Sequence, residues 1–378
     1  MGKVFYRPTF FIMKLFYSFC LLLLAHGTTT AQSATYYTIR GRVTDAQSGK
    51  PLQVASVFAQ HSTLGTATDA EGNFTLWLPM GGFDLAFTFT GYETVTRRVS
   101  GNDDSTQLLQ VTMKVREQSL EEVAVKSSNE VKDGLEKYGI FFNEQFIGAT
   151  PNSAACRLLN PEALKFYFSK KRNRLKVLAP DQPLLLENKA LGYRIRYSLD
   201  SFTYDYNTQT SLFAGYPLFE NMQPASEAET AQWTQNRSVA YRGSILHFMR
   251  SLYQRKLQEE GFELQFIVQY KERDTAISGL SYYAAMNFSY DDSTRVVEIL
   301  PNQPQVAVLY KKEKPSPAYL QLNPEAPAGF ELSIVQVPSG QAIGIEENGY
   351  YFDQQDLTIT GYWSWEKMAD MLPYDYRE

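Results

Sequence analysis

The sequence predicts a mainly β protein, in which a seven-stranded antiparallel β-sandwich precedes a larger β-rich (α+β) domain with one long amphipathic helix. The chain of 378 residues holds 25 Tyr and 24 Phe, residue types that favour strands. From residue 36 to about residue 125, short apolar runs are broken by turn residues at the spacing expected of a sandwich. After removal of a leader, ~350 residues remain, which is enough for two domains.

The first domain is predicted from alternating strands and the turns between them. Strands are expected in “YYTIRGRVTD”, “VASVFAQ”, “TLGTATDAEGNFTL”, “LPMGGFDLAFTFTGYETVTRRV” and “LLQVTMKV”, about seven in all because two of these stretches contain turns. Asp69 is expected to accept hydrogen bonds from the backbone, while Gly72 takes the positive φ that closes a type I hairpin turn. Gly49 and Gly91 are assigned to turns for the same reason. Asp69 and Gly72 do not have the spacing of an EF-hand calcium loop.

Three blocks in this region, “GRVTDAQSGKPLQVASV”, “GTATDAEGNFTL” and “GGFDLAFTFTGYE”, occur in the order and spacing of a known domain. Residues 40–113 resemble the carboxypeptidase regulatory-like domain, which implies a prealbumin-like (transthyretin-like) sandwich over residues 36–126. The following “QSLEEVAVKSS” resembles the junction after such domains in bacterial outer-membrane receptors. Only ~250 residues remain, too few for a receptor barrel and its plug. The resemblance to those receptors therefore stops at the N-terminal domain.

The resemblance does not imply a peptidase, because in the enzymes this sandwich is an accessory to a separate zinc domain. A catalytic zinc site needs about three protein ligands, usually including two histidines. After the leader, the chain has two histidines, His61 and His247, and neither begins a His-x-x-Glu motif. We therefore expect no enzyme activity of this class, no metal and no cofactor.

The N-terminus has the features of a secretory signal peptide, residues 1–31, cut after Ala31. Basic residues precede the apolar run “LFYSFCLLLLA”, which is too short for a permanent membrane helix; an uncleaved anchor is the alternative. The prediction is export to the periplasm, an outer-membrane-associated position or the cell surface, with no transmembrane helix in the mature chain. Cleavage removes basic residues and makes the net charge of −5 more negative, which argues against nucleic acid as a partner. It also leaves Cys156 without a disulfide partner.

A charged linker is placed at residues 127–137 and a β-rich domain at residues 138–378. Its best strand is in “ALGYRIRYSLDSFTYDYN”, where apolar and polar residues alternate. One long helix is expected in “SVAYRGSILHFMRSLYQRKLQEEG”, capped by Ser238 or Ser244 and stopped by Gly261. A short helix is expected from about Ser364, ending before Pro373. The set “NRSVAYRGSILHFMRSL”, “LLNPEALKF”, “ENKALGYRIRY” and “GYWSWEKMADMLP” resembles secreted bacterial proteins whose C-terminal region is uncharacterised.

The strongest candidate for chemistry is a polar ridge on this helix, made of His247, Arg250, Ser251 and Gln254. A Ser–His pair suggests nucleophilic catalysis, but the sequence shows no acid to orient the histidine. The polar side of an amphipathic helix predicts the same ridge without any catalysis. The aromatic run “GYWSW” is interpreted as core in preference to a sugar platform, and Cys156 as a buried thiol.

The function predicted from these observations is that of a secreted, non-enzymatic envelope protein. The sandwich would act in recognition or scaffolding, and the C-terminal domain would bind an envelope protein or a glycan. The alternative is a hydrolase of unfamiliar type with a site near His247. A pocket that joins His247 to a serine and an acid would favour this alternative.

Overall fold

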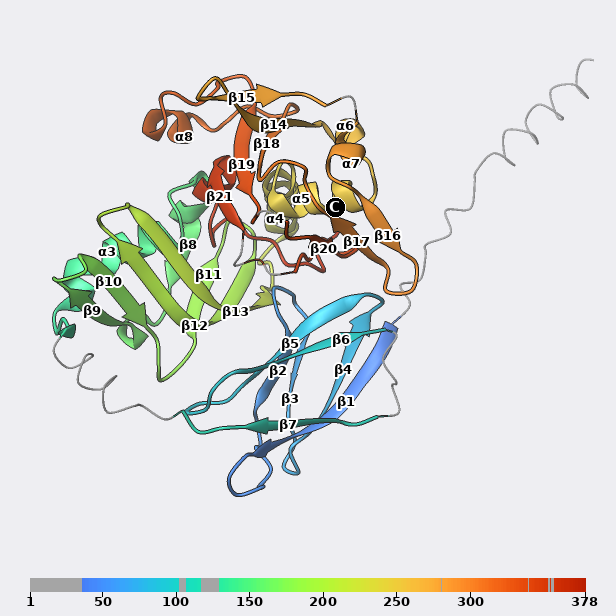
Figure 1. Cartoon of the computed structure of the whole chain (residues 1–378). Helices are drawn as coiled ribbons and strands as arrows, with labels where there is room; N and C mark the ends of the chain where they lie inside the picture. The colour runs from blue at the N-terminus through green and yellow to red at the C-terminus, as the bar shows by residue number, and fades with distance from the viewer. Residues whose placement is uncertain are drawn as a thin grey trace, which may run out of the picture. The chain divides into compact units, whose positions relative to one another are not determined.

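The computed structural model describes residues 36–101, 107–116, 129–279, 281–338, 340–352, 354 and 357–378 (Figure 1). The predicted signal peptide and the first two residues of the predicted linker lie outside these ranges. The described part of the linker, residues 129–137, runs into a helix, so the domain boundaries remain predictions. In the part of the chain that is described, no helix has the length and apolar character needed to cross a bilayer.

The N-terminal region forms a sandwich of seven strands, as predicted. The strands are β1 Tyr36–Asp45, β2 Ser56–Ala59, β3 Gly65–Ala67, β4 Asn73–Pro79, β5 Gly82–Thr88, β6 Val95–Ser100 and β7 Leu109–Met113. Their orders are β4-β1-β7 in one sheet and β3-β2-β5-β6 in the other. The pairing of β1 with β7 is parallel, which corrects the fully antiparallel prediction. The reason is that β6 and β7 lie in different sheets, so their connection is a crossover and not a hairpin.

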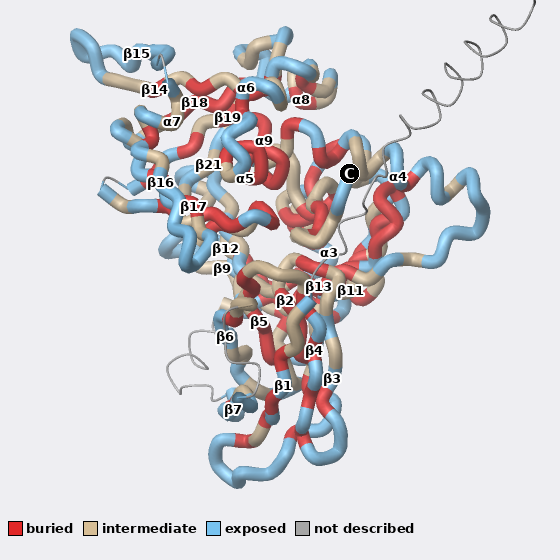
Figure 2. Tube along the Cα trace, turned by 90° about the vertical axis from the view of Figure 1, so that its right-hand side faces the viewer, coloured by how far each residue is buried: buried red, intermediate tan, exposed pale blue. Residues whose placement is uncertain are grey.

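The sandwich core follows from period-two alternation. In β4 the side chains of Phe74, Leu76 and Leu78 are buried, while those of the residues between them are exposed. Figure 2 shows buried residues along the strands of the sandwich and exposed residues in its loops. The inward side chains of both sheets form a single apolar cluster, which includes the fully buried Val43, Val57 and Phe87. This alternation is why a sequence without a structural disulfide still specifies a sandwich.

Each of the four glycine and aspartate residues assigned to turns lies in a turn or loop. Asp69 Oδ1 accepts hydrogen bonds from the backbone N–H of Glu71 at 3.0 Å and of Asn73 at 2.7 Å. Gly72 donates its N–H to the carbonyl of Asp69 at 3.0 Å and has a φ of 78°. The φ angles of Gly49 and Gly91 are 67° and 83°. These angles are in the left-handed region that favours glycine.

The second part of the chain begins with helix α3, Gly134–Phe146, and a six-stranded sheet (Figure 1). Its strands are β8 Cys156–Leu158, β9 Lys165–Ser169, β10 Arg174–Leu178, β11 Leu184–Asn188, β12 Tyr193–Asp205 and β13 Thr210–Asn221. Strand β12 is the predicted alternating strand: Tyr193, Ile195 and Tyr197 are buried between exposed arginines. Phe142 and Phe146 of α3 pack edge-on against Phe202 and Tyr197 of this strand, with ring centroids 5.0 Å apart in each pair.

Two further sheets complete the second part. The larger has the order β15-β14-β18-β19-β21 and the smaller β16-β17-β20. Their strands are β14 Phe262–Tyr270, β15 Arg273–Ile277, β16 Ser289–Asp291, β17 Val296–Ile299, β18 Gln305–Tyr310, β19 Glu331–Gln336, β20 Ile343–Ile345 and β21 Thr358–Gly361. Short helices α7 Tyr282–Ala285 and α8 Pro317–Leu322 lie in the connections. The two sheets share one apolar cluster with the helix that carries His247.

The prediction of one long helix is wrong in its continuity. The segment forms α4 Glu227–Tyr241, α5 Ile245–Tyr253 and α6 Leu257–Glu260. The first break is at Gly243, whose φ of 74° is incompatible with a right-handed helix, and Ser244 then caps α5 by accepting from the N–H of His247. Gly261, in the left-handed conformation, ends α6 as expected.

The predicted C-terminal helix is also shorter than expected. Helix α9 spans Tyr362–Trp365, and the backbone becomes extended at Glu366, with a ψ of 126°. The N–H groups of Met368 and Ala369 instead donate to the carbonyls of Phe146 and Ile147 at the end of α3. Tertiary hydrogen bonds therefore replace the helical ones that the local sequence favours.

Candidate functional site: a groove between the sandwich and the second sheet

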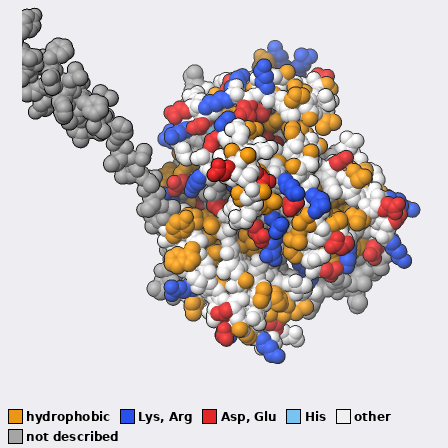
Figure 3. Space-filling model, turned by 180° about the vertical axis from the view of Figure 1, so that it is seen from behind, with side chains coloured by type: hydrophobic (Ala, Val, Ile, Leu, Met, Phe, Trp, Pro, Cys, Tyr) orange, Lys and Arg blue, Asp and Glu red, His pale blue; other side chains and the backbone are white. Residues whose placement is uncertain are grey.

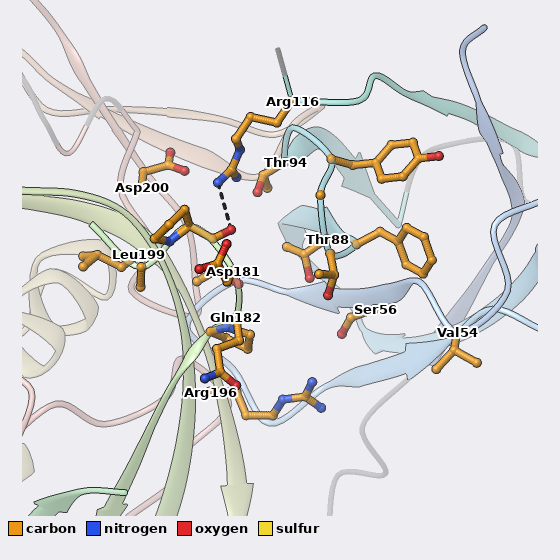
Figure 4. A pocket seen from close by; sticks show the side chains of 18 residues that line it. Val54, Ser56, Thr88, Thr94, Arg116, Asp181, Gln182, Arg196, Leu199 and Asp200 are labelled. Atoms are coloured by element: carbon orange, nitrogen blue, oxygen red, sulfur yellow. Dashed lines mark hydrogen bonds between the residues drawn. The ribbon is translucent and has the colours of Figure 1, made fainter. Parts of the chain in front are cut away.

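A groove of about 290 Å³ lies between the sandwich and the sheet that contains β12 (Figure 4). The sandwich contributes its turn between β5 and β6, together with Ser56 and Arg116. The second part contributes the connection between β10 and β11 and the outward residues of β12. Hydrogen-bonding side chains dominate the lining: Ser56, Thr88, Thr90, Thr94, Arg116, Asp181, Gln182, Arg196, Ser198 and Asp200.

The position of Arg116 depends on the turn at Gly91. The carbonyl of Gly91 accepts a hydrogen bond from the N–H of Arg116 at 2.9 Å, and Glu93 donates its N–H to the carbonyl of Lys114 at the same distance. The chain that leaves the sandwich is thereby held against the β5–β6 turn. From there Arg116 reaches the second part, where Nη1 donates to the carbonyl of Pro180 at 3.5 Å, the contact drawn in Figure 4. The conformation of Gly91 therefore helps to place a cationic side chain in the groove.

The groove carries charges of both signs. Partial desolvation raises the pKa of Asp200, against the opposing effects of its hydrogen bond with Tyr216 and of the positive charge of Arg116. The pKa of Tyr216 rises to about 12, first by desolvation and then through Asp200. Arg196 of β12 lies 3.8 Å from Glu220 across the strand pair, an exposed contact that contributes little to stability. Guanidinium, carboxylate and hydroxyl groups thus line the same groove.

The polar ridge predicted on the helix lies mostly in the protein interior. This corrects the prediction that it forms the solvent-facing side of the helix. His247, Arg250 and Ser251 of α5 are buried, and Gln254 is exposed at the C-terminal cap. Arg250 donates from Nε to the carbonyl of Asn348 and from Nη2 to that of Tyr374, each at 2.9 Å. Three of the four ridge residues therefore face the protein and not the solvent. Arg250 thus links α5 by hydrogen bonds to the segments that contain Asn348 and Tyr374.

The environment of His247 fixes its tautomer. Nδ1 accepts the N–H of Gly243 at 3.2 Å, so Nδ1 carries no proton and Nε2 faces Glu260 Oε2 at 3.4 Å. Burial lowers the pKa of His247, and Glu260 opposes this shift. Ser244 Oγ donates to the carbonyl of Tyr241, while Ser251 Oγ donates to the carbonyl of His247 itself. Among the described residues, the ridge does not bring a serine hydroxyl to the imidazole as a nucleophile–base pair requires.

A seam that the sequence did not reveal joins the sandwich to the second part. Glu346, with 8% of its side chain exposed, accepts the N–H of Gly82 at 2.7 Å and forms an ion pair with Arg98. Arg98 also lies 3.4 Å from Asp84, which is hydrogen-bonded to the hydroxyl of Tyr350. The partners are far apart in the sequence, so no local motif marks them.

The loop after β2 makes a second set of contacts, with the C-terminal segment and with β13. The N–H of Thr63 donates to Asp375 Oδ1 at 2.8 Å, and the N–H of Tyr374 donates to the carbonyl of His61 at 2.6 Å. Ser62 accepts the N–H of Phe219 at 2.9 Å through its carbonyl. Together with the seam, these bonds join the sandwich to the second part.

Other candidate residues have structural surroundings. Trp363 is buried, with its indole N–H donating to the carbonyl of Gly243 at 2.6 Å, so “GYWSW” contributes to the core as interpreted. Cys156 is half-buried, and desolvation, followed by the charge of Asp370, raises its pKa to about 12. No group of three or more His, Cys, Asp or Glu residues is arranged to hold a metal ion in the ranges that the structure describes.

Comparison with known proteins identifies the N-terminal domain. Residues 39–125 match the family model of the CarboxypepD_reg-like domain, which confirms the resemblance drawn from the sequence blocks. The TonB-dependent receptor P39 of Formosa agariphila is 31% identical over 123 residues, which are 32% of this chain and 10% of the receptor. The chain therefore spans about a tenth of the length of that curated relative.

A search of solved structures gave a match to a 9R-lipoxygenase from Cyanothece PCC8801. It is 9% identical, covers 58% of this chain and 48% of the lipoxygenase, and has a TM-score of 0.16. A likeness this slight carries no argument about fold or function.

Proposed function

We propose that this chain, whose residues 39–125 match the CarboxypepD_reg-like domain, acts as an exported, non-enzymatic binding protein of the cell envelope. The sandwich forms one side of the groove, and the groove between it and β12 binds a glycan. The relative named a TonB-dependent receptor supports an envelope setting. The observation that carries the proposal is the groove itself, because both parts of the chain build it.

The lining of the groove favours a glycan over a strongly charged polymer. Sugar hydroxyls both donate and accept hydrogen bonds, as do the serine, threonine and glutamine side chains of the groove. Arg116 and Arg196 add two positive charges, and Asp181 and Asp200 add two negative charges, a balance that suits a neutral or zwitterionic chain. On the face drawn in Figure 3, basic and acidic side chains are likewise interspersed, without a large field of one sign.

The test is binding of the full chain to glycans isolated from the envelope of the source bacterium, measured by calorimetry. We expect Arg116→Gln and Asp200→Asn to weaken binding by about tenfold each, because each substitution removes a charge-assisted hydrogen bond. Arg97→Gln is the control, since Arg97 is exposed on β6 outside the groove. Equal affinity of all three variants for the glycan would show that the groove is not the binding site.

A further inference from the structure

The sandwich has two outer faces, and they differ in what covers them. Phe58 of β2 and Ala86 of β5 form an apolar cluster with Leu218 of β13, so the outer face of the sheet β3-β2-β5-β6 packs against the second part. The outer face of β4-β1-β7, on the other side of the sandwich core, is named the open face. It is made of every second residue of β1 from Tyr36 to Thr44, of β4 from Asn73 to Trp77 and of β7 from Gln110 to Thr112, all exposed or half-buried.

Two large aromatic side chains lie on the open face. Trp77 is 61% exposed and Tyr36 is 55% exposed, whereas the other three tryptophans of the chain are buried or half-buried. Tyr36 pairs with Pro79, so Trp77 is its diagonal neighbour across the strand pair, at a distance of about 7–8 Å. Neither ring is needed for the core, because the inward positions of β4 already fill it. The two rings offer flat apolar surfaces on which the C–H faces of sugar rings stack.

The open face also carries positive charge and no acid. Arg40 and Arg42 of β1 follow the aromatic pair along the strand, and Arg40 is a diagonal neighbour of Trp77. Arg42 Nε donates to the backbone carbonyl of Glu71 at 2.9 Å, and among the described residues no carboxylate pairs with either arginine. None of the outward positions of the three strands is Asp or Glu, although the chain as a whole has a net charge of −5. This local charge favours an anionic partner.

The composition of the open face distinguishes between possible partners. A second copy docked about a twofold axis would bring the arginines of both copies together without a carboxylate between them, so self-association is disfavoured. The outward threonine, asparagine and glutamine side chains both donate and accept hydrogen bonds, as sugar hydroxyls do. The outward positions from Tyr36 to Arg42 extend over about 20 Å, which suits a chain of linked sugars better than a single small ion.

We propose that the open face binds an acidic glycan, a chain of sugar units that carry carboxylate groups. Sugar rings stack on Trp77 and Tyr36, and the carboxylates accept hydrogen bonds from the planar guanidinium groups of Arg40 and Arg42. The threonine side chains between these residues bind ring hydroxyls. The open face shares no residue with the groove beside β12, so this site is additional to the glycan site proposed there and does not depend on it.

The test measures binding of the full chain to a short oligogalacturonate by calorimetry at low ionic strength. Two comparison ligands separate the contributions: the fully methyl-esterified oligomer keeps the sugar rings without the charge, and polyglutamate keeps the charge without sugar rings. We expect a Kd on the order of 100 μM for the oligogalacturonate and at least about tenfold weaker binding of both comparison ligands. Equal binding of either comparison ligand, or no binding of the oligogalacturonate at millimolar concentration, would overturn the proposal.

Variants assign the binding to the open face. Trp77→Ala and Arg40→Gln should each weaken oligogalacturonate binding by about tenfold, because the first removes a stacking surface and the second a charge-assisted hydrogen bond. Tyr270→Ala and Arg172→Gln are the matched controls: Tyr270 of β14 is likewise 61% exposed, and Arg172 lies in the exposed basic turn between β9 and β10. Both controls should bind as the unmodified chain does. Equal losses in controls and open-face variants would contradict the site.

Sedimentation of the unmodified chain and of Trp77→Ala tests a second copy as the occupant of the open face. We expect the same mass for both proteins, because the face lacks acids to pair with the arginines of another copy. A dimer that dissociates in Trp77→Ala would assign the open face to self-association and refute the glycan site. The comparison of ligands on the unmodified chain stands even if a variant does not fold.

Discussion

The sandwich and the second part of the chain differ in how their buried polar groups find hydrogen-bond partners. The buried polar residues of the sandwich are few and are satisfied by its own turns: Asp45 accepts the N–H groups of Gln47 and Ser48, and Thr68 accepts that of Ala55. The second part buries ionisable side chains whose partners are distant in sequence. Among these, Arg250 and Glu331 have 5% and 6% of their surface exposed. The first region is thus specified by local turns, and the second by long-range polar contacts.

If local turns specify the sandwich, Gly72→Val should have the largest effect of any substitution considered. A Cβ at residue 72 would lie 2.5 Å from the carbonyl oxygen of Val43, and the φ of 78° is unfavourable for a branched side chain. We expect a loss of roughly 3–5 kcal/mol in the free energy of unfolding. Urea unfolding followed by fluorescence of Trp77, the tryptophan of the sandwich, measures it.

Gly49→Val is the control for Gly72→Val. Its φ is 67°, but a Cβ there would meet nothing within 4 Å. We expect it to cost about 1–2 kcal/mol, from backbone strain alone. Equal losses at the two glycines would mean that the contact with Val43 does not matter.

A substitution in the seam tests whether the sandwich and the second part of the chain unfold together. Glu346→Ala leaves the N–H of Gly82 without its acceptor and Arg98 without its buried partner. We expect a loss of about 2–4 kcal/mol and a Trp77 transition that separates from the transition of the other tryptophans. Glu347→Ala, next in sequence but exposed and paired with Arg295, should cost at most about 1 kcal/mol. A single shared transition in Glu346→Ala would show that other contacts are sufficient to couple the regions.

Glu331 makes the stability of the second region depend on pH. Desolvation, followed by the charge of Glu313, raises its pKa to about 8 in the folded state. The folded chain therefore holds a proton that the unfolded chain releases near pH 4, so this residue lowers stability as the pH rises from about 4 to about 8. We expect Glu331→Gln to be more stable than the unmodified chain by about 2 kcal/mol or more at pH 8.5 and nearly equal to it at pH 4.5. Parallel stability curves over this range would contradict the assignment.

Cys156 should show the smallest effect. Its pKa of about 12 keeps the thiol protonated, and its Sγ lies 3.5 Å from the carbonyl of Asn152. We expect slow labelling by a thiol reagent at pH 8 in the folded chain and fast labelling after unfolding. Cys156→Ser should change stability by less than about 1 kcal/mol. Fast labelling of the folded chain would place the thiol at the surface.

The sequence predicts the sandwich better than the second part because its determinants are local. Asp69 and Gly72 lie three residues apart, and their chemistry defines one turn wherever the chain carries it. The break at Gly243 was missed because apolar residues keep their helical period across it. Burial of the ridge was missed because the partners of Arg250, at Asn348 and Tyr374, are distant in sequence. The groove is likewise formed by tertiary packing.

The parallel pairing of β1 with β7 has a mechanical consequence. The chain enters the sandwich at Tyr36 and leaves it at Met113, which lies beside Asp45 at the far end of β1. A pulling force between entry and exit is directed along these strands, so the hydrogen bonds between β1 and its two neighbours are loaded together in shear. We expect the sandwich to resist more force in this direction than when pulled across the strands, which single-molecule stretching from the two pairs of attachment points would measure. The domain is therefore suited to transmit tension between the chain segments attached at its two ends.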